Sequence, residues 1–177
     1  MALEHGAINL SQGFPDFPVD KKIIDLISKF MHEGHNQYAP MPGVPALRNV
    51  IAEVISKTYS HSVDPETEIT ITAGATEALF SAIAALVDKG DEVILFDPSY
   101  DSYAPAIRLN GGVPVHINLR YPEFSIDWEQ VKSKINARTR IIMVNTPQNP
   151  SGAVLSEQDL KTLQSLAVEH DLLVLSD

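Results

Sequence analysis

A run of small residues, Ala73 to Thr76, stands between a short β-branched stretch and a segment of helical period. The first N–H groups of a helix have no partner within the helix and lie at its positive end. Such a turn can hold a phosphate, because Gly74 allows close approach of the backbone and Thr76 offers both a hydroxyl and an amide. Considered alone, the segment favours an ordinary tight turn in which Thr76 caps the helix, since its glycine spacing matches neither a Walker A loop nor a dinucleotide-binding turn.

A second segment with chemical potential is NTPQNPSG, residues 145–152, which follows an apolar run. The prolines after Thr146 and Asn149 push both residues away from helical geometry and can hold the Asn149 side chain in a fixed direction. The amide of Asn149 can donate one hydrogen bond to a planar ligand and accept another from it. A rigid loop that only covers the end of a sheet is an equally good interpretation.

An aspartate and two tyrosines complete the set of candidate ligand contacts. Asp177 follows the apolar run Leu172–Leu175, and burying an unpaired polar group costs about 1 to 3 kcal/mol even when the group is neutral. A protonated ring nitrogen would supply the partner, although a surface aspartate at the start of a loop is the commoner case. Tyr100 and Tyr103 follow Pro98 in DPSYDSYAP, where a ring could stack on a planar ligand. For at least one of the two, packing under its own loop is the better interpretation.

The elements that must position these residues form an α/β pattern. Five apolar runs are predicted as buried strands, at Ile69–Thr72, Glu92–Phe96, Val113–Ile117, Arg140–Asn145 and Leu172–Leu175. Helices are predicted at Glu77–Val87, Trp128–Ile135 and Glu157–Glu169, with Asp127 and Gln130, and Ser156 and Asp159, as the capping pairs of the last two. The alternation predicts a mostly parallel sheet with crossover helices, whose ligands collect at the carboxyl ends of the strands.

The first third of the chain has a different character. Two amphipathic helices are predicted at Lys21–Glu33 and Pro45–Ser60, without a strand between them. We therefore assign residues 1–60 to an N-terminal helical segment and residues 61–177 to the first part of the α/β domain. Because the chain stops directly after a predicted buried strand, we expect it to be a fragment of that domain.

Composition narrows the possible partners and sites. Thirteen basic and twenty-three acidic residues among 177 give a formal charge of -10, which opposes nonspecific attraction to nucleic acid and to anionic membranes. The absence of cysteine excludes disulfides, thiolate metal sites and cysteine nucleophiles, and it is compatible with a reducing cytoplasm. No apolar run approaches the roughly 20 residues of a membrane span. We expect a cytoplasmic protein without a metal site.

The candidate segments together resemble the cofactor site of fold type I aminotransferases, which depend on pyridoxal 5'-phosphate (PLP). The resemblance covers the whole chain and is carried by NLSQGFPDF, NQYAPMPGVPALR, TAGATEALF, DPSYDSYAPA, NTPQNPSGAV and LVLSD. These motifs are similar to those of the branch that contains methionine aminotransferases and the kynurenine aminotransferases or cysteine-conjugate β-lyases. The chain is thus expected to form part of the large, PLP-binding domain of that fold, with residues 1–60 beginning the small domain and the dimer contacts.

The resemblance assigns a role to each candidate residue. It implies that Gly74, Ala75 and Thr76 hold the PLP phosphate, Tyr100 stacks on the pyridine ring, Asn149 donates to the ring hydroxyl oxygen and Asp177 pairs with the ring nitrogen. Of these, Tyr100, Asn149 and Asp177 would take part in catalysis, since Asp177 would keep the ring protonated as an electron sink.

The resemblance also implies contacts with the substrate and with a second subunit. Gly13 would contact the substrate carboxylate through its backbone, and Asn149 would also bind the substrate. Tyr38 would reach the phosphate of the neighbouring subunit's cofactor in a homodimer. The lysine that binds the cofactor covalently and the arginine that grips the substrate carboxylate would lie beyond Asp177. The fragment itself is therefore expected to be inactive.

The function implied for the full-length parent is transfer of an amino group from an amino acid, methionine or an aromatic one, to a 2-oxo acid. A cysteine-conjugate β-lyase would use every residue named so far and stays open as an alternative. A non-catalytic PLP-fold module, such as the sensor half of a transcription regulator, stays open too, although the acidic charge and the missing basic arm count against it. A dinucleotide-binding domain is disfavoured because the first strand-to-helix turn lacks the required glycine spacing.

Overall fold

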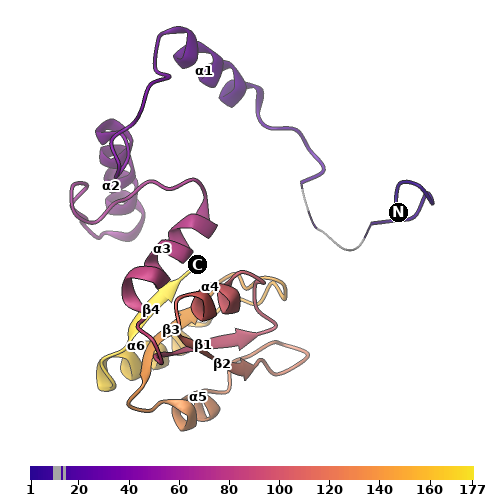
Figure 1. The fold of residues 1–177 in the computed structure, drawn as a ribbon, viewed down its shortest axis with the longest axis vertical. Helices are drawn as coiled ribbons and strands as arrows, with labels where there is room; N and C mark the ends of the chain where they lie inside the picture. Colours follow the sequence, from indigo (N-terminus) through magenta and orange to yellow (C-terminus); the bar gives the residue numbers. More distant parts are fainter. Residues whose placement is uncertain (10–12, 14) are drawn as a thin grey trace. The chain divides into compact units, whose positions relative to one another are not determined.

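The computed structural model describes residues 1–9, 13 and 15–177 (Figure 1). The chain divides into two compact units, Met1–Ile69 and Thr70–Asp177. Each unit has its own secondary structure, and the C-terminal unit contains the sheet. No helix in the described part of the chain is long and apolar enough to cross a membrane.

The C-terminal unit is built on a parallel sheet. Its strands are β1 (Glu92–Asp97), β2 (Val113–Asn118), β3 (Thr139–Val144) and β4 (Leu173–Ser176), in the order β2-β1-β3-β4. Each neighbouring pair is parallel, and Ile94 in β1 stands opposite Val115 in β2 and Ile142 in β3. The predicted α/β class with a mostly parallel sheet is thereby confirmed.

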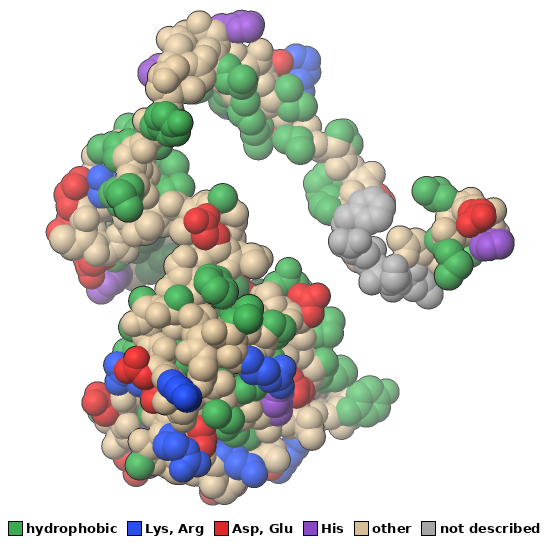
Figure 2. Space-filling view, in the orientation of Figure 1, with side chains coloured by type: hydrophobic (Ala, Val, Ile, Leu, Met, Phe, Trp, Pro, Cys, Tyr) green, Lys and Arg blue, Asp and Glu red, His purple; other side chains and the backbone are tan. Residues whose placement is uncertain are grey.

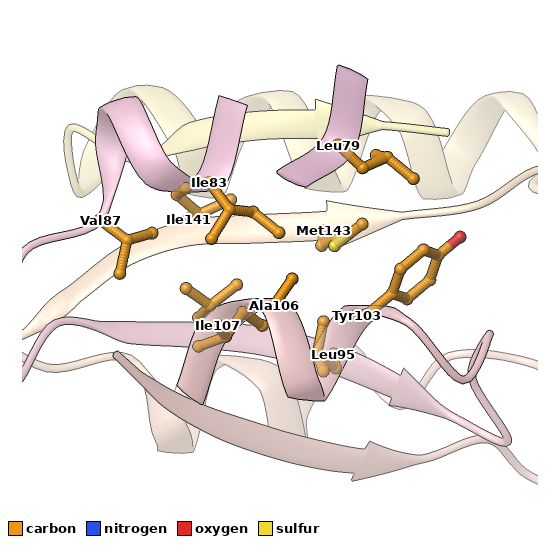
Figure 3. Close-up of a cluster of buried hydrophobic side chains, with 10 residues drawn as sticks. Leu79, Ile83, Val87, Leu95, Tyr103, Ala106, Ile107, Ile141 and Met143 are labelled. Carbon is orange, nitrogen blue, oxygen red and sulfur yellow. The ribbon is translucent and has the colours of Figure 1, made fainter. Parts of the chain in front are cut away.

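Helices cover both faces of this sheet. On one face, α3 (Ala75–Leu86) and α4 (Tyr103–Leu109) pack on alternate residues of β1 and β3. Figure 3 shows this cluster, in which Ile83 and Ile107 approach Ile141 from the two helices. On the other face, α5 (Trp128–Lys134) and α6 (Glu157–Glu169) enclose a second cluster. Because both faces are covered, the first five residues of β1 are buried in succession, as expected for a central parallel strand.

The predicted capping pairs are present at the starts of α5 and α6. The Asp127 side chain accepts a hydrogen bond from the Gln130 amide at 3.2 Å. Ser156 and Asp159 form a reciprocal capping box, in which each side chain bonds the backbone amide of the other. Local sequence therefore determines where these two helices begin.

Two of the sequence predictions for the chain from Ile69 onward were wrong. Ile69–Thr72 is not a strand, since it pairs with none of the four strands in the described part of the chain. Ile69 is nevertheless buried, so the apolar character of this run reflects burial and not ladder pairing. Conversely, α4 was not predicted, and its seven residues, which include Pro105, were interpreted as part of a loop. That proline falls in the first turn, where the missing N–H removes no intrahelical bond.

The N-terminal unit contains the two predicted helices, α1 (Lys21–His32) and α2 (Pro45–Tyr59). The Asp20 side chain caps α1 by accepting from the Lys22 amide at 2.7 Å. Arg48 of α2 is buried and donates to the carbonyls of Gly43 and Pro65. The apolar side chains of α1 are exposed, and Figure 2 shows them gathered along that helix.

Candidate functional site

The sheet order creates a crevice between β1 and β3. From β1 the chain passes to β2 on one side, and the next strand, β3, then pairs on the other side of β1. In open α/β sheets, ligands bind at such a switch point, outside the carboxyl ends of the strands. The segments that leave β1 and β3 at this edge carry Tyr100 and Asn149.

A pocket of about 290 Å³ lies at this edge. Its lining consists of Ala75, Thr76, Leu79, Tyr100, Asn145, Asn149 and Asp177. Five of these residues are ones for which the sequence predicted cofactor contacts, and they come from four separate segments of the chain. The fold therefore brings the predicted phosphate, ring and nitrogen contacts to a single pocket.

Gly74 is the N-cap of α3, directly beside this pocket. Its φ of +97° lies in the left-handed region, so any other residue here would be strained even though an added Cβ would meet nothing within 4 Å. Because the cap is Gly74, Thr76 does not cap α3 and instead lies in its first turn. Its amide and that of Ala75 therefore belong to the first-turn donors that an α-helix leaves without intrahelical partners.

The two tyrosines after β1 occupy different environments. Tyr100 is half-buried and lines the pocket, whereas Tyr103 is only 4% exposed and belongs to the core cluster under α3 and α4. Their rings meet edge to face, with centroids 5.6 Å apart. Tyr100 is thus the ring available for stacking, and Tyr103 is the one packed in the interior.

The Tyr103 hydroxyl donates a hydrogen bond to Oδ2 of Asp177. Burial raises the pKa of this hydroxyl, and the hydrogen bond and charge of Asp177 raise it further. The phenol therefore remains protonated and keeps donating at ordinary pH. The sequence alone gave no indication of this contact, because the two residues are 74 positions apart.

Asn145 is a site residue that the sequence analysis missed. Its Nδ2 donates to the main-chain carbonyl of Asp177 at 3.0 Å, and its Oδ1 accepts from the Asn149 amide at 2.6 Å. The Asp177 amide in turn donates to the Val144 carbonyl at 2.9 Å. The signal that could have revealed Asn145 is its place at the head of NTPQNPSG, but it was assigned to the end of a strand.

The loop after β3 is fixed by a second side chain, Gln148. Its Nε2 donates to the Pro98 carbonyl in the loop after β1, and its Oε1 accepts from the Ser151 amide at 2.9 Å. These hydrogen bonds tie the loop to itself and to the loop after β1. The loop after β3 also presents Asn149 to the pocket, so the two interpretations of this segment are compatible.

A neighbouring cavity of about 230 Å³ is lined largely by apolar residues that include Phe96, Leu119, Phe124 and Leu155. Tyr103 and Asn145 line it, but none of the residues to which the resemblance assigns a cofactor contact does. The pocket beside Asp177 is therefore the better candidate for the cofactor site, because it contains the expected polar and aromatic groups.

Gly13 and Tyr38 belong to the N-terminal unit. Gly13 is exposed, but its neighbours at 10–12 and 14, which include three of the seven residues of the motif SQGFPDF, lie outside the described residues. Tyr38 is fully exposed and free of covering side chains within the described chain. Their roles toward substrate and neighbouring subunit remain predictions.

The residues around the pocket fit PLP chemically. The start of α3 offers backbone amides and the Thr76 hydroxyl to a phosphate. Tyr100 offers an aromatic face, Asn149 an amide and Asp177 a carboxylate, which match a flat ring that bears a hydroxyl and a protonated nitrogen. These groups thus match the phosphate, the ring hydroxyl and the ring nitrogen of one molecule.

Comparison with known proteins agrees with this arrangement. The family model for aminotransferase class I and II matches residues 5–177. Methionine aminotransferase from Escherichia coli (strain K12) is 48% identical over 177 residues, which are 100% of this chain and 46% of that protein. Kynurenine–oxoglutarate transaminase 3 from Mus musculus is 37% identical over an alignment of 188 positions, which covers 100% of this chain and 41% of that protein.

Solved structures give the same result. The crystal structure of YbdL from Escherichia coli, described as having a methionine aminotransferase function, superposes with a TM-score of 0.96 at 48% identity, over 99% of this chain and 47% of that one. The aromatic aminotransferase from Pyrococcus horikoshii OT3 gives a TM-score of 0.91 at 37% identity, over 95% and 45% of the two chains. The chain spans less than half the length of these relatives. The predicted resemblance is confirmed, and the chain belongs to the class I and II aminotransferase family.

Proposed function

We propose that the complete protein containing this chain transfers an amino group from an amino acid to a 2-oxo acid with the help of PLP. The observation that carries the proposal is the pocket in which Ala75, Thr76, Tyr100, Asn149 and Asp177 come together. Methionine or an aromatic amino acid is the proposed donor. The similarity to methionine aminotransferase from Escherichia coli, at 48% identity, and to the aromatic aminotransferase from Pyrococcus horikoshii supports this choice.

Each pocket residue has a defined task in this proposal. The amides at the start of α3 and the Thr76 hydroxyl bind the phosphate, where the positive end of the helix favours an anion. Tyr100 covers one face of the ring, and Asn149 donates to the ring hydroxyl oxygen. When bound, PLP supplies an electron sink for the electrons released at the substrate α-carbon.

Asp177 has the central electrostatic task. A carboxylate next to the ring nitrogen favours the protonated, positively charged form of that nitrogen. Tyr103 and Asn145 hold Asp177 at its side chain and its main chain respectively, so the carboxylate is oriented before any ligand arrives. Such preorganisation avoids part of the entropic cost of binding.

The N-terminal unit completes the proposal. Gly13 is proposed to contact the substrate carboxylate through its backbone. Tyr38 reaches the cofactor phosphate of a neighbouring subunit in a homodimer, and its full exposure leaves it available for such a contact. The absence of cysteine is compatible with a reducing compartment, and we include the cytoplasm in the proposal on that basis.

The direct test is an assay of the complete protein, loaded with PLP, with methionine or kynurenine and a 2-oxo acid. We expect one equivalent of a new amino acid for each equivalent of donor consumed, and an Asp177→Ala variant should lose nearly all of this activity. Asp25→Asn is the matched control, because it removes only an exposed ion pair with Lys21.

The products distinguish the competing functions. If a cysteine conjugate yields ammonia and pyruvate and no new amino acid forms, the protein catalyses β-elimination and not amino transfer. Tight binding of PLP without turnover of any amino acid would instead indicate a non-catalytic module.

A further inference from the structure

Tyr103 belongs to the core and does not line the pocket, but its hydroxyl donates to Asp177, which does. Its ring packs among Leu95, Ala106 and Met143, and Figure 3 shows it at the end of this cluster. It is the first residue of α4, and the helix and core together fix the position of the ring. A hydroxyl carried on such a buried ring is a rigid donor.

Asp177, in contrast, is exposed and lines the pocket. An exposed aspartate samples several side-chain rotamers unless a hydrogen bond selects one. The Tyr103 hydroxyl occupies Oδ2, and Asn145 holds the main-chain carbonyl of the same residue. One oxygen of the carboxylate, Oδ1, is therefore left to face a ligand.

We propose that Tyr103 is a positioning residue for Asp177, which holds Oδ2 so that Oδ1 meets the ring nitrogen of PLP. The inference rests on the proposed function, since it takes PLP as the occupant of the pocket. It assigns to a buried core tyrosine a task beyond packing. Tyr103 itself touches neither cofactor nor substrate.

The decisive variant is Tyr103→Phe in the complete protein, because it removes the hydroxyl and keeps the ring. A hydrogen bond to a charged group contributes enough that its loss should raise the Kd for PLP about tenfold. The absorbance band of bound PLP should also titrate at a different pH, because the ring nitrogen has lost its fixed partner. Tyr121→Phe is the matched control, since Tyr121 is 82% exposed and lies outside the pocket lining.

A double-mutant comparison separates positioning from packing. If Tyr103 acts through Asp177, then Tyr103→Phe should not change the Kd further in an Asp177→Ala background. A purely structural role would lower the melting temperature of the protein without PLP and leave both the Kd and the absorbance titration unchanged. That result would overturn the inference.

A second measurement covers the case in which Tyr103→Phe does not fold. Asp177→Ala changes only an exposed side chain. In the PLP-free protein it should lower the pH at which Tyr103, the tyrosine expected to ionise last, loses its proton. Ultraviolet absorbance follows this ionisation. An unchanged titration would mean that the pair does not form and would overturn the inference.

The outcomes also separate this inference from the proposed function. If the wild-type protein binds PLP and Tyr103→Phe binds it with the same Kd and spectrum, only the inference fails. If the wild-type protein does not bind PLP at all, the proposed function fails and the inference fails with it.

Discussion

Asn145 joins the ends of two neighbouring strands, because its Nδ2 donates to the main-chain carbonyl of Asp177 at 3.0 Å. Its Oδ1 accepts from the Asn149 amide at 2.6 Å. A single amide side chain thus fixes two residues that we expect to contact different atoms of the same ring. The distance between those two contacts therefore depends on Asn145.

Replacing Asn145 should weaken PLP binding without unfolding the protein. We expect Asn145→Ala to raise the Kd for PLP about tenfold, since it removes two hydrogen bonds at a partly solvated edge of the sheet. Asn145→Asp keeps the acceptor for the Asn149 amide and loses the donor to Asp177. Its Kd for PLP should therefore lie between those of the wild type and Asn145→Ala. Equilibrium dialysis measures all three, and equal Kd values for the wild type and Asn145→Ala would contradict this account.

Thr76 should matter only for ligands that carry a phosphate. Thr76→Val removes the hydroxyl at the start of α3 and keeps the size of the side chain. We expect it to weaken the binding of PLP about tenfold, while the binding of pyridoxal, which has no phosphate, stays unchanged. Thr76→Ser restores the hydroxyl and should recover most of the affinity for PLP. Equal losses for PLP and pyridoxal would assign Thr76 to the ring and not to the phosphate.

Tyr103 should also affect stability at high pH. Burial, followed by the hydrogen bond and charge of Asp177, raises the pKa of its hydroxyl above the ordinary value near 10. As the pH rises past about 10, the unfolded chain loses this proton while the folded chain retains it, so the contribution to stability is complete below that pH and is lost above it.

The corresponding experiment is urea denaturation of the complete protein between about pH 9 and 11. In this range the free energy of unfolding of Tyr103→Phe should fall less steeply with pH than that of the wild type. Tyr121→Phe should follow the wild type, because its hydroxyl lies on the surface. Identical slopes for Tyr103→Phe and wild type would show that the Tyr103 hydroxyl ionises normally.

Glu92 lies at the start of β1, at the end of the sheet opposite the pocket, and it should affect stability at low pH. Its buried carboxylate accepts from Asn136 Nδ2 at 2.7 Å and from Arg138 Nε at 2.9 Å. The Asn136 hydrogen bond and the Arg138 guanidinium hold the pKa of Glu92 below its usual range, although burial opposes them. The stabilisation is therefore present above the unfolded pKa and is lost as the pH falls through the folded pKa.

Glu92→Gln tests this linkage. The variant should be less stable than the wild type at neutral pH by about 1 to 2 kcal/mol, because a charged acceptor is lost. The difference should shrink between about pH 5 and 3, where the wild type loses the same stabilisation. Glu157→Gln, which removes an exposed pair with Lys161, should have little effect at neutral pH. A constant difference across the whole range would contradict the assignment.

Much of the fold was predictable because its signals are local. The capping residues Asp127 and Ser156 mark the starts of α5 and α6, and the apolar runs gave all four strands to within a residue or two at each end. The two predictions that failed lacked a sufficient local signal. The apolar pattern of Ile69–Thr72 does not reveal whether a neighbouring strand exists, and α4 is too short to show a helical period.

Some parts of the candidate site were likewise predictable from local sequence, and others were not. The segments around Gly74, Tyr100, Asn149 and Asp177 were recognisable because each follows an element that the sequence predicts. Tyr100, Asn149 and Asp177 converge on one pocket because the strands before them run in a common direction, whereas the segment around Gly74 does not follow a strand. The supporting contacts of Asn145 and Tyr103 could not be predicted, since they join positions 32 and 74 residues from Asp177 and exist only once β3, β4 and α4 have packed.

The most direct test of the central claim is a crystal structure of the complete protein grown with PLP. This account predicts the phosphate at the start of α3, the ring against Tyr100, the ring nitrogen within hydrogen-bond distance of Asp177, and Asn149 beside the ring hydroxyl. Density for PLP in another cavity, or with its ring nitrogen turned away from Asp177, would contradict it.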